Sequence, residues 1–275
     1  MPKLLRCPEC GHGYSWSVRR GHRKCKSKKC RHEWSPGKIH PVRGFRLSKR
    51  EWMRVIDSFL RDGAAAKVAA ESRIAYPTAH KAVTAIRQVM HDDVPEILYG
   101  TCEADETYVG GSWRNKAVHI RRQGTKRGRG TSKQPIFGLI QRAHDDLHER
   151  SQVRVWLTPD TKNRTLMPHV RKTVCRGSAI YTDGRKGYRH LPRYGYLHEW
   201  VDHDAGEYVR GQVHTQNMDG YWGRLKTHLD SIGGIRKERL HLFIGEHVWR
   251  FNHRHLTRKE QAKIIYSHLT EIGGR

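Results

Sequence analysis

The chain has 275 residues, enough for one sizeable core with small satellite modules, and it carries 53 Lys and Arg residues against 27 Asp and Glu. The formal net charge of +26 indicates a polyanionic partner. The absence of a signal peptide and of any apolar run of about 18 residues argues against a membrane protein, so we expect a cytoplasmic protein that binds nucleic acid.

Four of the six cysteines lie in two close pairs near the start of the sequence. Cys7 and Cys10 form the first pair, and Cys25 and Cys30 follow after an arm of fourteen residues. Each pair can bend around one side of a tetrahedral ion while the arm forms a hairpin between them. Clustered cysteines in a reducing cytoplasm indicate a metal rather than disulfides. We therefore predict a structural Zn²⁺ held by all four; the alternatives are unligated thiols, or a nearby histidine in place of one ligand.

A helical module follows a connector that is rich in Pro, Gly and Arg. Ser48 and Glu51 have the spacing of a capping box, and they predict the start of a helix with a regular apolar face. An alanine-rich helix is expected at about 64–71 and another at about 76–90. This is the layout of a helix-turn-helix, although an ordinary helical hairpin has the same pattern. The residues that such a module would offer to a DNA groove are Thr78, His80, Lys81 and Thr84.

The next segment contains two adjacent acids and then a strongly basic stretch. Residues 101–111 read as a strand that runs into a glycine turn, so Asp105 and Glu106 should point to opposite faces and only one can face a site. Residues 112–133 carry eight Lys and Arg and no acid, and they are predicted to form a mobile basic loop. Two isolated cysteines, Cys102 and Cys175, are expected to be small buried side chains.

The remaining elements predict an α/β domain. Strands are expected at 135–140, 153–157, 178–181 and 195–201, and helices at 162–174, 212–229 and 239–251. The result is a mixed sheet flanked by helices, with two acids at strand ends, where α/β proteins place their sites.

One predicted helix carries both an acid and a cation on one face. Asp219, Trp222, Gly223 and Lys226 fall at i, i+3, i+4 and i+7, opposite Asp183 at a strand end. Phosphodiester transfer needs an activated hydroxyl and a stabilised leaving oxygen, and two divalent ions held by shared carboxylates supply both. Three carboxylates from distant segments are of the kind that can hold Mg²⁺, although each acid taken alone is better explained as a surface or capping residue.

Several motifs occur together in one order, and together they carry a resemblance. They are Cys7-Pro-Glu-Cys10, the helical pair, Ala104-Asp-Glu-Thr-Tyr-Val-Gly-Gly111, Tyr181-Thr-Asp183, Ala205-Gly-Glu-Tyr-Val-Arg-Gly211, His214-Thr215, Asp219-Gly-Tyr-Trp222, Leu225-Lys226 and Phe251-Asn-His-Arg254. Over almost its whole length the chain resembles the zinc-ribbon group of bacterial insertion-sequence transposases. These belong to the DDE superfamily and have an RNase H-like catalytic fold.

The resemblance implies the roles of individual residues. Asp105 and Asp183 would be the first two metal ligands, Asp219 the third, and Lys226 a contact to DNA phosphate. The third position in this group is often Glu, and many relatives have Asn where this chain has Gln216. Glu207 is the alternative third ligand, ranked behind Asp219.

The resemblance also implies an activity, cofactors and partners. The expected protein binds the terminal inverted repeats of an insertion sequence and uses two Mg²⁺ (or Mn²⁺) ions to cleave strands and join them to target DNA. It would act on double-stranded DNA as a dimer or higher homo-oligomer, in the bacterial cytoplasm at the nucleoid and without a membrane. The alternatives are an inactive or domesticated DNA-binding derivative, and a junction or RNA–DNA hybrid nuclease of the same fold.

The predicted domains follow from these elements. They are a zinc ribbon with its basic connector (1–46), a helix-turn-helix module (47–98), an RNase H-like catalytic domain (99–258) and a C-terminal tail (259–275).

Overall fold

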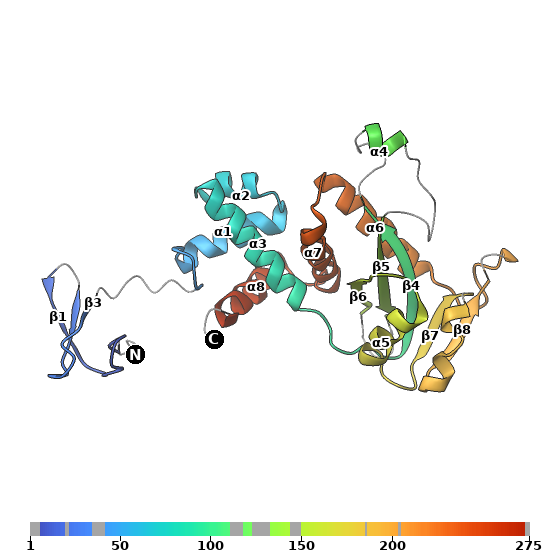
Figure 1. Ribbon diagram of the computed structural model, residues 1–275, viewed down its shortest axis with the longest axis horizontal. Helices are drawn as coiled ribbons and strands as arrows, with labels where there is room; N and C mark the ends of the chain where they lie inside the picture. Colours follow the sequence, from blue (N-terminus) through green and yellow to red (C-terminus); the bar gives the residue numbers. More distant parts are fainter. Residues whose placement is uncertain are drawn as a thin grey trace.

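The structure is a computed structural model. It describes residues 6–19, 22–34, 42–110, 118–122, 133–143, 150–184, 186–202 and 205–272. These residues form a small N-terminal sheet, a group of helices and a larger α/β unit (Figure 1). No helix within them is both long and apolar enough to cross a lipid bilayer.

The N-terminal sheet brings the two cysteine pairs together. Its strands β1 (Ser15–Ser17), β2 (Arg23–Cys25) and β3 (Glu33–Trp34) are antiparallel and lie in that order. Because Ser15 pairs with Cys25, the arm between the cysteine pairs folds back as the predicted hairpin. The sheet is drawn in blue at one end of Figure 1.

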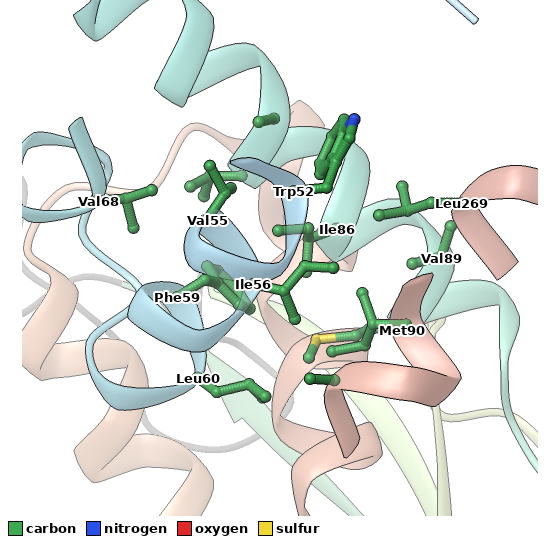
Figure 2. Close-up of a cluster of buried hydrophobic side chains, with 14 of the residues drawn as sticks. Trp52, Val55, Ile56, Phe59, Leu60, Val68, Ile86, Val89, Met90 and Leu269 are labelled. Atoms are coloured by element: carbon green, nitrogen blue, oxygen red, sulfur yellow. The ribbon is translucent and has the colours of Figure 1, made fainter. Parts of the chain in front are cut away.

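Three helices follow at nearly the predicted positions: α1 (Lys49–Arg61), α2 (Ala65–Ser72) and α3 (Tyr76–Asp92). The capping box is present, since the Ser48 side chain accepts from the Glu51 backbone while the Glu51 carboxylate accepts from the Ser48 backbone. Trp52, Val55, Ile56 and Phe59 of α1 are fully buried against α3 in the cluster shown in Figure 2.

A helix from the far end of the sequence completes this group. The stretch expected to be a tail contains α8 (Arg258–Ile272), which packs against α1 and α3. Its buried residues Ala262, Ile265 and Leu269 recur at helical spacing, and Figure 2 shows Leu269 beside Val89. The first and last helices of the chain therefore share one core.

The larger unit is built on a five-stranded mixed sheet in the order β6-β5-β4-β7-β8. β5 pairs antiparallel with both of its neighbours, β6 and β4, whereas β4, β7 and β8 run parallel. The strands are β4 (Thr101–Val109), β5 (Gln134–Gln141), β6 (Gln152–Leu157), β7 (Ala179–Asp183) and β8 (Leu197–Val201). The predicted mixed α/β architecture is confirmed.

Helices cover both faces of this sheet. One face packs on α5 (Asn163–Thr173), which continues through Pro168, and the other on α6 (Gln216–Ile232) and α7 (Leu240–Asn252). Alternate side chains of β5 pack against the helices on the two faces of the sheet. Phe137 lies in the core under α5 and Ile136 in the core under α6. Short 3-10 helices are η5 (Lys186–Tyr188), η6 (Leu191–Tyr194) and η8 (Lys237–Arg239).

The predicted basic loop contains regular structure. Helix α4 (Val118–Arg122) lies within it, and Arg121 and Arg122 on this helix are exposed. Other basic residues of this loop, Lys126, Arg127 and Arg129, lie outside the described residues.

A buried ion cluster joins the helical group to the α/β unit. Glu246 of α7 is 2% exposed; its carboxylate accepts from Arg87 of α3 at 2.7 Å and from Arg250 at 2.9 Å. Burial alone would raise the pKa of Glu246, but the charges of Arg250 and Arg87 outweigh it and hold this pKa below its usual value. Arg250 also donates to the carbonyls of Phe59 and Leu60 at the end of α1. Removing one partner of such a pair typically costs about 3–5 kcal/mol, so this contact resists separation of the two units.

Candidate functional site

Asp105 and Glu106 point to opposite faces of β4, as the strand pattern predicts. The indole nitrogen of Trp222 on α6 donates to Oδ2 of Asp105 at 2.9 Å. On the α5 face, the Tyr188 hydroxyl donates to the buried Glu106 carboxylate. Burial, and then the charge of Glu106, raises the pKa of Tyr188 well above its usual value. Asp105 is therefore the acid that faces α6.

Asp183 lies beside Asp105 on the neighbouring parallel strand. Glu103 pairs with Tyr181 in the β4–β7 ladder, and Asp105 and Asp183 each follow two residues later, on the same face. The charges of both aspartates also contribute to the raised pKa of Tyr188, which places all three groups in one region. Asp183 ends β7, whereas Asp105 lies in the middle of β4 and not at the strand end that the sequence predicts, because β4 continues to Val109. The two adjacent strands thus present two acids under α6.

Asp219 and Lys226 are both exposed residues of α6. Asp219 is in the first turn, where its Oδ2 accepts a long bond of 3.4 Å from the Thr215 hydroxyl. Trp222 follows one turn later and reaches Asp105, so Asp219 lies on the side of α6 next to that strand. Lys226 is exposed two turns from Asp219. The helix thus carries an acid and a cation past the strand that bears Asp105.

A missing side chain allows α6 to approach this closely. Gly138 pairs with Asp105 across the β4–β5 ladder. A Cβ atom at Gly138 would overlap the end of Met218 and lie 2.6 Å from the Trp222 ring. Glycine is therefore required at this position of β5, because a side chain there would displace the indole ring that reaches Asp105.

Sequence reasoning missed Glu103, a fully buried acid on the same face as Asp105. Its carboxylate accepts from the backbone N–H of Met218 at 2.9 Å and from the Asn217 side chain at 2.7 Å, both at the start of α6. Arg142 completes the shell at 2.7 Å. Glu103 therefore caps the N-terminus of α6, a position where a carboxylate is favoured. Its position two residues before Asp105 on one strand was the available signal.

Arg142 ties a further segment to this cap. Its guanidinium donates to the His214 carbonyl and contacts Nδ1 of His214 at 3.0 Å. His214 Nδ1 also lies 3.5 Å from Glu103, but this is not an ion pair. Burial, and then the charge of Arg142, lowers the pKa of His214, and Nδ1 accepts from Arg142 as a neutral ring. The segment that leads into α6 is thus held by the same buried carboxylate.

The carboxylate of Glu207, the alternative third ligand, contacts residues of its own loop. Its Oε2 accepts from the backbone N–H of Asp202 at 3.3 Å, and Oε1 lies 3.9 Å from Arg210. Both partners belong to the segment after β8.

The three aspartates do not form a closed ligand set. Among the described residues, only the four cysteines form a group of three or more potential ligands with atoms within 4.8 Å of one another. Asp105, Asp183 and Asp219 are neighbours through strand register and helix packing. Carboxylate oxygens are the ligands that Mg²⁺ prefers, and a divalent cation would offset their mutual repulsion.

The cysteine cluster fits a zinc ion. The Cys7 and Cys30 sulfurs are 3.8 Å apart, and those of Cys10 and Cys25 are 3.5 Å apart. Four Zn–S bonds of about 2.3 Å in tetrahedral geometry place the sulfurs about 3.8 Å apart. The spacing that the sequence predicts to hold zinc therefore produces a site of suitable size.

The predicted groove residues lie on α3, where several make internal contacts. Lys81 is exposed but donates to the Gly44 carbonyl at 2.9 Å. Thr84 donates to the His80 carbonyl, and the His80 ring contacts Arg239 at 3.3 Å. Of the expected isolated cysteines, Cys102 is buried as predicted, whereas the prediction for Cys175 is wrong because this residue is exposed.

Comparisons of the sequence with a family model and with known proteins agree on one family. A family model described as an ISXO2-like transposase domain matches residues 97–252. A transposase-like protein of Haemophilus influenzae is 28% identical over 116 residues, which are 42% of this chain and 92% of that protein. A protein in transposable element ISH50 of Halobacterium salinarum is 28% identical over 209 residues, 70% of this chain and 66% of that protein. The chain thus spans about two thirds of the length of the Halobacterium relative.

Among solved structures, a pre-cleavage Mos1 transpososome aligns with 87% of this chain and 83% of its own, at 7% identity and a TM-score of 0.19. A score this low does not indicate a shared fold.

Proposed function

Because the chain belongs to the ISXO2-like transposase family, we propose that it is the transposase of an insertion sequence. It binds the terminal inverted repeats, cleaves strands with the help of a divalent metal and joins the freed 3′ ends to target DNA. The observation that carries the proposal is the position of Asp105 and Asp183 on neighbouring parallel strands, facing the same way, with Asp219 on the helix that packs over Asp105.

The catalytic unit is proposed to be an RNase H-like domain, supported by its mixed sheet with helices on both faces. Asp105, Asp183 and Asp219 would hold two Mg²⁺ or Mn²⁺ ions. When bound, such ions activate the attacking hydroxyl and stabilise the leaving oxygen. The chain itself orients Asp105 through Trp222 and holds the start of α6 through Glu103.

Lys226 is proposed to bind a DNA phosphate. Its ammonium group is exposed on the side of α6 that carries Asp219. A cation at this position would hold the DNA backbone near the acids and would counter the repulsion between phosphate and carboxylates.

The two N-terminal modules are proposed to bind the element ends. Cys7, Cys10, Cys25 and Cys30 would hold a structural Zn²⁺, since four thiolates leave no open coordination position. Helices α2 and α3 are joined by three residues, Arg73 to Ala75, which supports a helix-turn-helix. Because Glu246 ties α3 to α7, DNA read by this module would be held at a set position relative to the catalytic acids.

Partners and location follow from the reaction. Two ends must be processed together, so a dimer or higher oligomer on DNA is proposed, at the nucleoid of a bacterial cytoplasm. The net charge of +26 supports the DNA partner.

The test is nicking of a supercoiled plasmid that carries the DNA flanking this gene. The wild type with Mg²⁺ should cut at the element ends and leave 3′-hydroxyls, which join to a second plasmid. Asp105→Asn should bind the ends equally but cut more than about 100-fold more slowly. End binding without cutting in Mg²⁺ or Mn²⁺ would show an inactive DNA-binding derivative. Cutting of junctions or hybrids without joining would show a nuclease.

A further inference from the structure

A basic cleft of about 310 Å³ lies at the end of α5, away from the candidate catalytic acids. Its lining residues are Pro168, Arg171, Lys172, Arg176, Tyr194 and Tyr196. None of these residues has a role in the proposed reaction. The cleft is on the face of the sheet that α5 covers, whereas Asp105 faces α6 on the other side.

The three cations of this cleft have no acidic partner. Arg171, Lys172 and Arg176 are all exposed, and none of them forms an ion pair within the described part of the chain. From 161 to 182 the sequence carries five Lys and Arg and no acid, and from 184 to 198 four more and no acid. Like charges gathered without compensation repel one another, so an anion at this point would stabilise the surface.

Two tyrosines shape the cleft. The Arg171 guanidinium lies 4.9 Å from the centre of the Tyr194 ring, which restricts its direction. The Tyr196 hydroxyl donates to the Val174 carbonyl at 3.1 Å. Burial raises the pKa of Tyr196, and the charges of Arg176 and Arg171 oppose this rise, which indicates that both guanidiniums lie near the hydroxyl. The cations are thus held around an aromatic floor.

The cleft and Asp183 lie at opposite ends of β7. Arg176 precedes β7 and Asp183 ends it, and five residues at about 3.3 Å each separate the two ends by roughly 17 Å. Figure 1 shows α5 near the lower end of the sheet. Because the cleft lies on the α5 face of the sheet and Asp105 faces α6, a straight duplex seated on the acids would not enter the cleft as well.

We propose that this cleft binds the phosphate backbone of a second DNA segment, distinct from the segment that is cut. The inference rests on the proposed transposase function, which requires more than one DNA segment in the complex. Exposed cations in a continuous basic surface suit a long polyanion, whose binding gains from counterion release. A site for a small free anion would instead enclose its ligand with buried donors.

Cys175 supplies a reporter within the cleft region. It lies between Lys172 and Arg176 and is exposed. The test uses zinc-loaded Asp105→Asn protein and a duplex without element ends, present at about nine times its dissociation constant. One tenth of the protein is then free, so the duplex should slow iodoacetamide alkylation of Cys175 about tenfold. An unchanged rate would overturn the proposal. Equal protection by inorganic phosphate at the same phosphate concentration would show a small-anion site and also overturn it.

A charge-removal pair tests the cations directly. Each phosphate contact contributes about 0.9 to the slope of log K against log salt, so Arg171→Gln with Arg176→Gln should reduce this slope by about 1.8. The control, Lys259→Gln with Lys263→Gln, removes two exposed charges from α8 and should leave the slope unchanged. Equal loss in both pairs would mean that only total charge matters, which contradicts a site. A wild type that fails to nick while Cys175 is protected would overturn the proposed reaction and leave the cleft standing.

Discussion

The indole N–H of Trp222 donates to Oδ2 of Asp105 at 2.9 Å, and this bond joins α6 to the central strand β4. The bond restricts rotation of the Asp105 side chain. A residue on the helix that carries Asp219 therefore sets the direction of the acid on the strand.

Trp222→Phe should slow nicking more than it destabilises the fold. Phenylalanine keeps an aromatic ring at this position but lacks the donor to Asp105 and the outer indole atoms that lie nearest Gly138. A hydrogen bond to a charged group contributes about 1.5–3 kcal/mol, so nicking should fall about 10- to 100-fold if the bond acts on orientation. Trp156→Phe is the control, because Trp156 stacks on Phe137 on the α5 face. Nicking rates and thermal unfolding are measured together; equal rates for the two variants would contradict the role of the bond.

Gly138→Ala should destabilise the α6 layer by about 1–3 kcal/mol, because the new methyl group overlaps the Trp222 ring. Denaturant unfolding measures this loss. Gly220→Ala is the matched control, since its Cβ would meet only the end of Arg224 at 3.9 Å on the exposed side of the helix. That substitution should stabilise the protein slightly by raising helix propensity. A neutral Gly138→Ala would mean that α6 can shift without cost.

Glu103→Gln should lower the free energy of unfolding by about 3–5 kcal/mol, because Arg142 loses its buried partner. If Glu103 positions α6, the variant should also need more Mg²⁺ for half-maximal nicking at temperatures where it is fully folded. Glu106→Gln is the control, since the Glu106 carboxylate points to the other face of the sheet and accepts from Tyr188. An unchanged Mg²⁺ requirement in folded Glu103→Gln would reduce its role to stability alone.

Asp219→Asn should abolish nicking while folding and DNA binding survive, because it removes one anionic oxygen and almost no volume. Asp219→Glu should keep substantial activity, since it adds one methylene toward the residue common in the resembling group. Glu207→Gln should cut normally, as its carboxylate binds its own loop. Normal cutting by Asp219→Asn together with a dead Glu207→Gln would exchange the two roles.

Cys25→Ser should reduce bound zinc from about one ion per chain to almost none, because the remaining three thiolates bind the ion far less well. Binding to element ends should weaken, whereas the catalytic unit, with its separate core, should stay folded. Metal content is measured by atomic emission. Cys175→Ser is the control, and it should keep its zinc, since Cys175 lies outside the cluster. Full zinc content in Cys25→Ser would remove the four-cysteine assignment.

Local patterns in the sequence were sufficient for several elements, although not for α8, which lies in the expected tail. The capping box at Ser48 starts α1, and alternation along β4 separates Asp105 from Glu106. The cysteine spacing produced a cluster of the size zinc requires. These features depend on residues a few positions apart, or on the short hairpin that joins the two cysteine pairs. The periodicity and spacing of residues in the sequence therefore determine them.

Contacts between distant segments were decided only by the tertiary structure. The partners of Glu103 on α6 lie 114 and 115 residues away, and α8 returns to the core of α1. The basic cleft likewise combines α5 with residues near β8. Such pairs depend on strand order, on register and on the path of each crossover connection. A helical or alternating pattern in the sequence predicts which face of an element is apolar, but it does not predict which surface will cover that face.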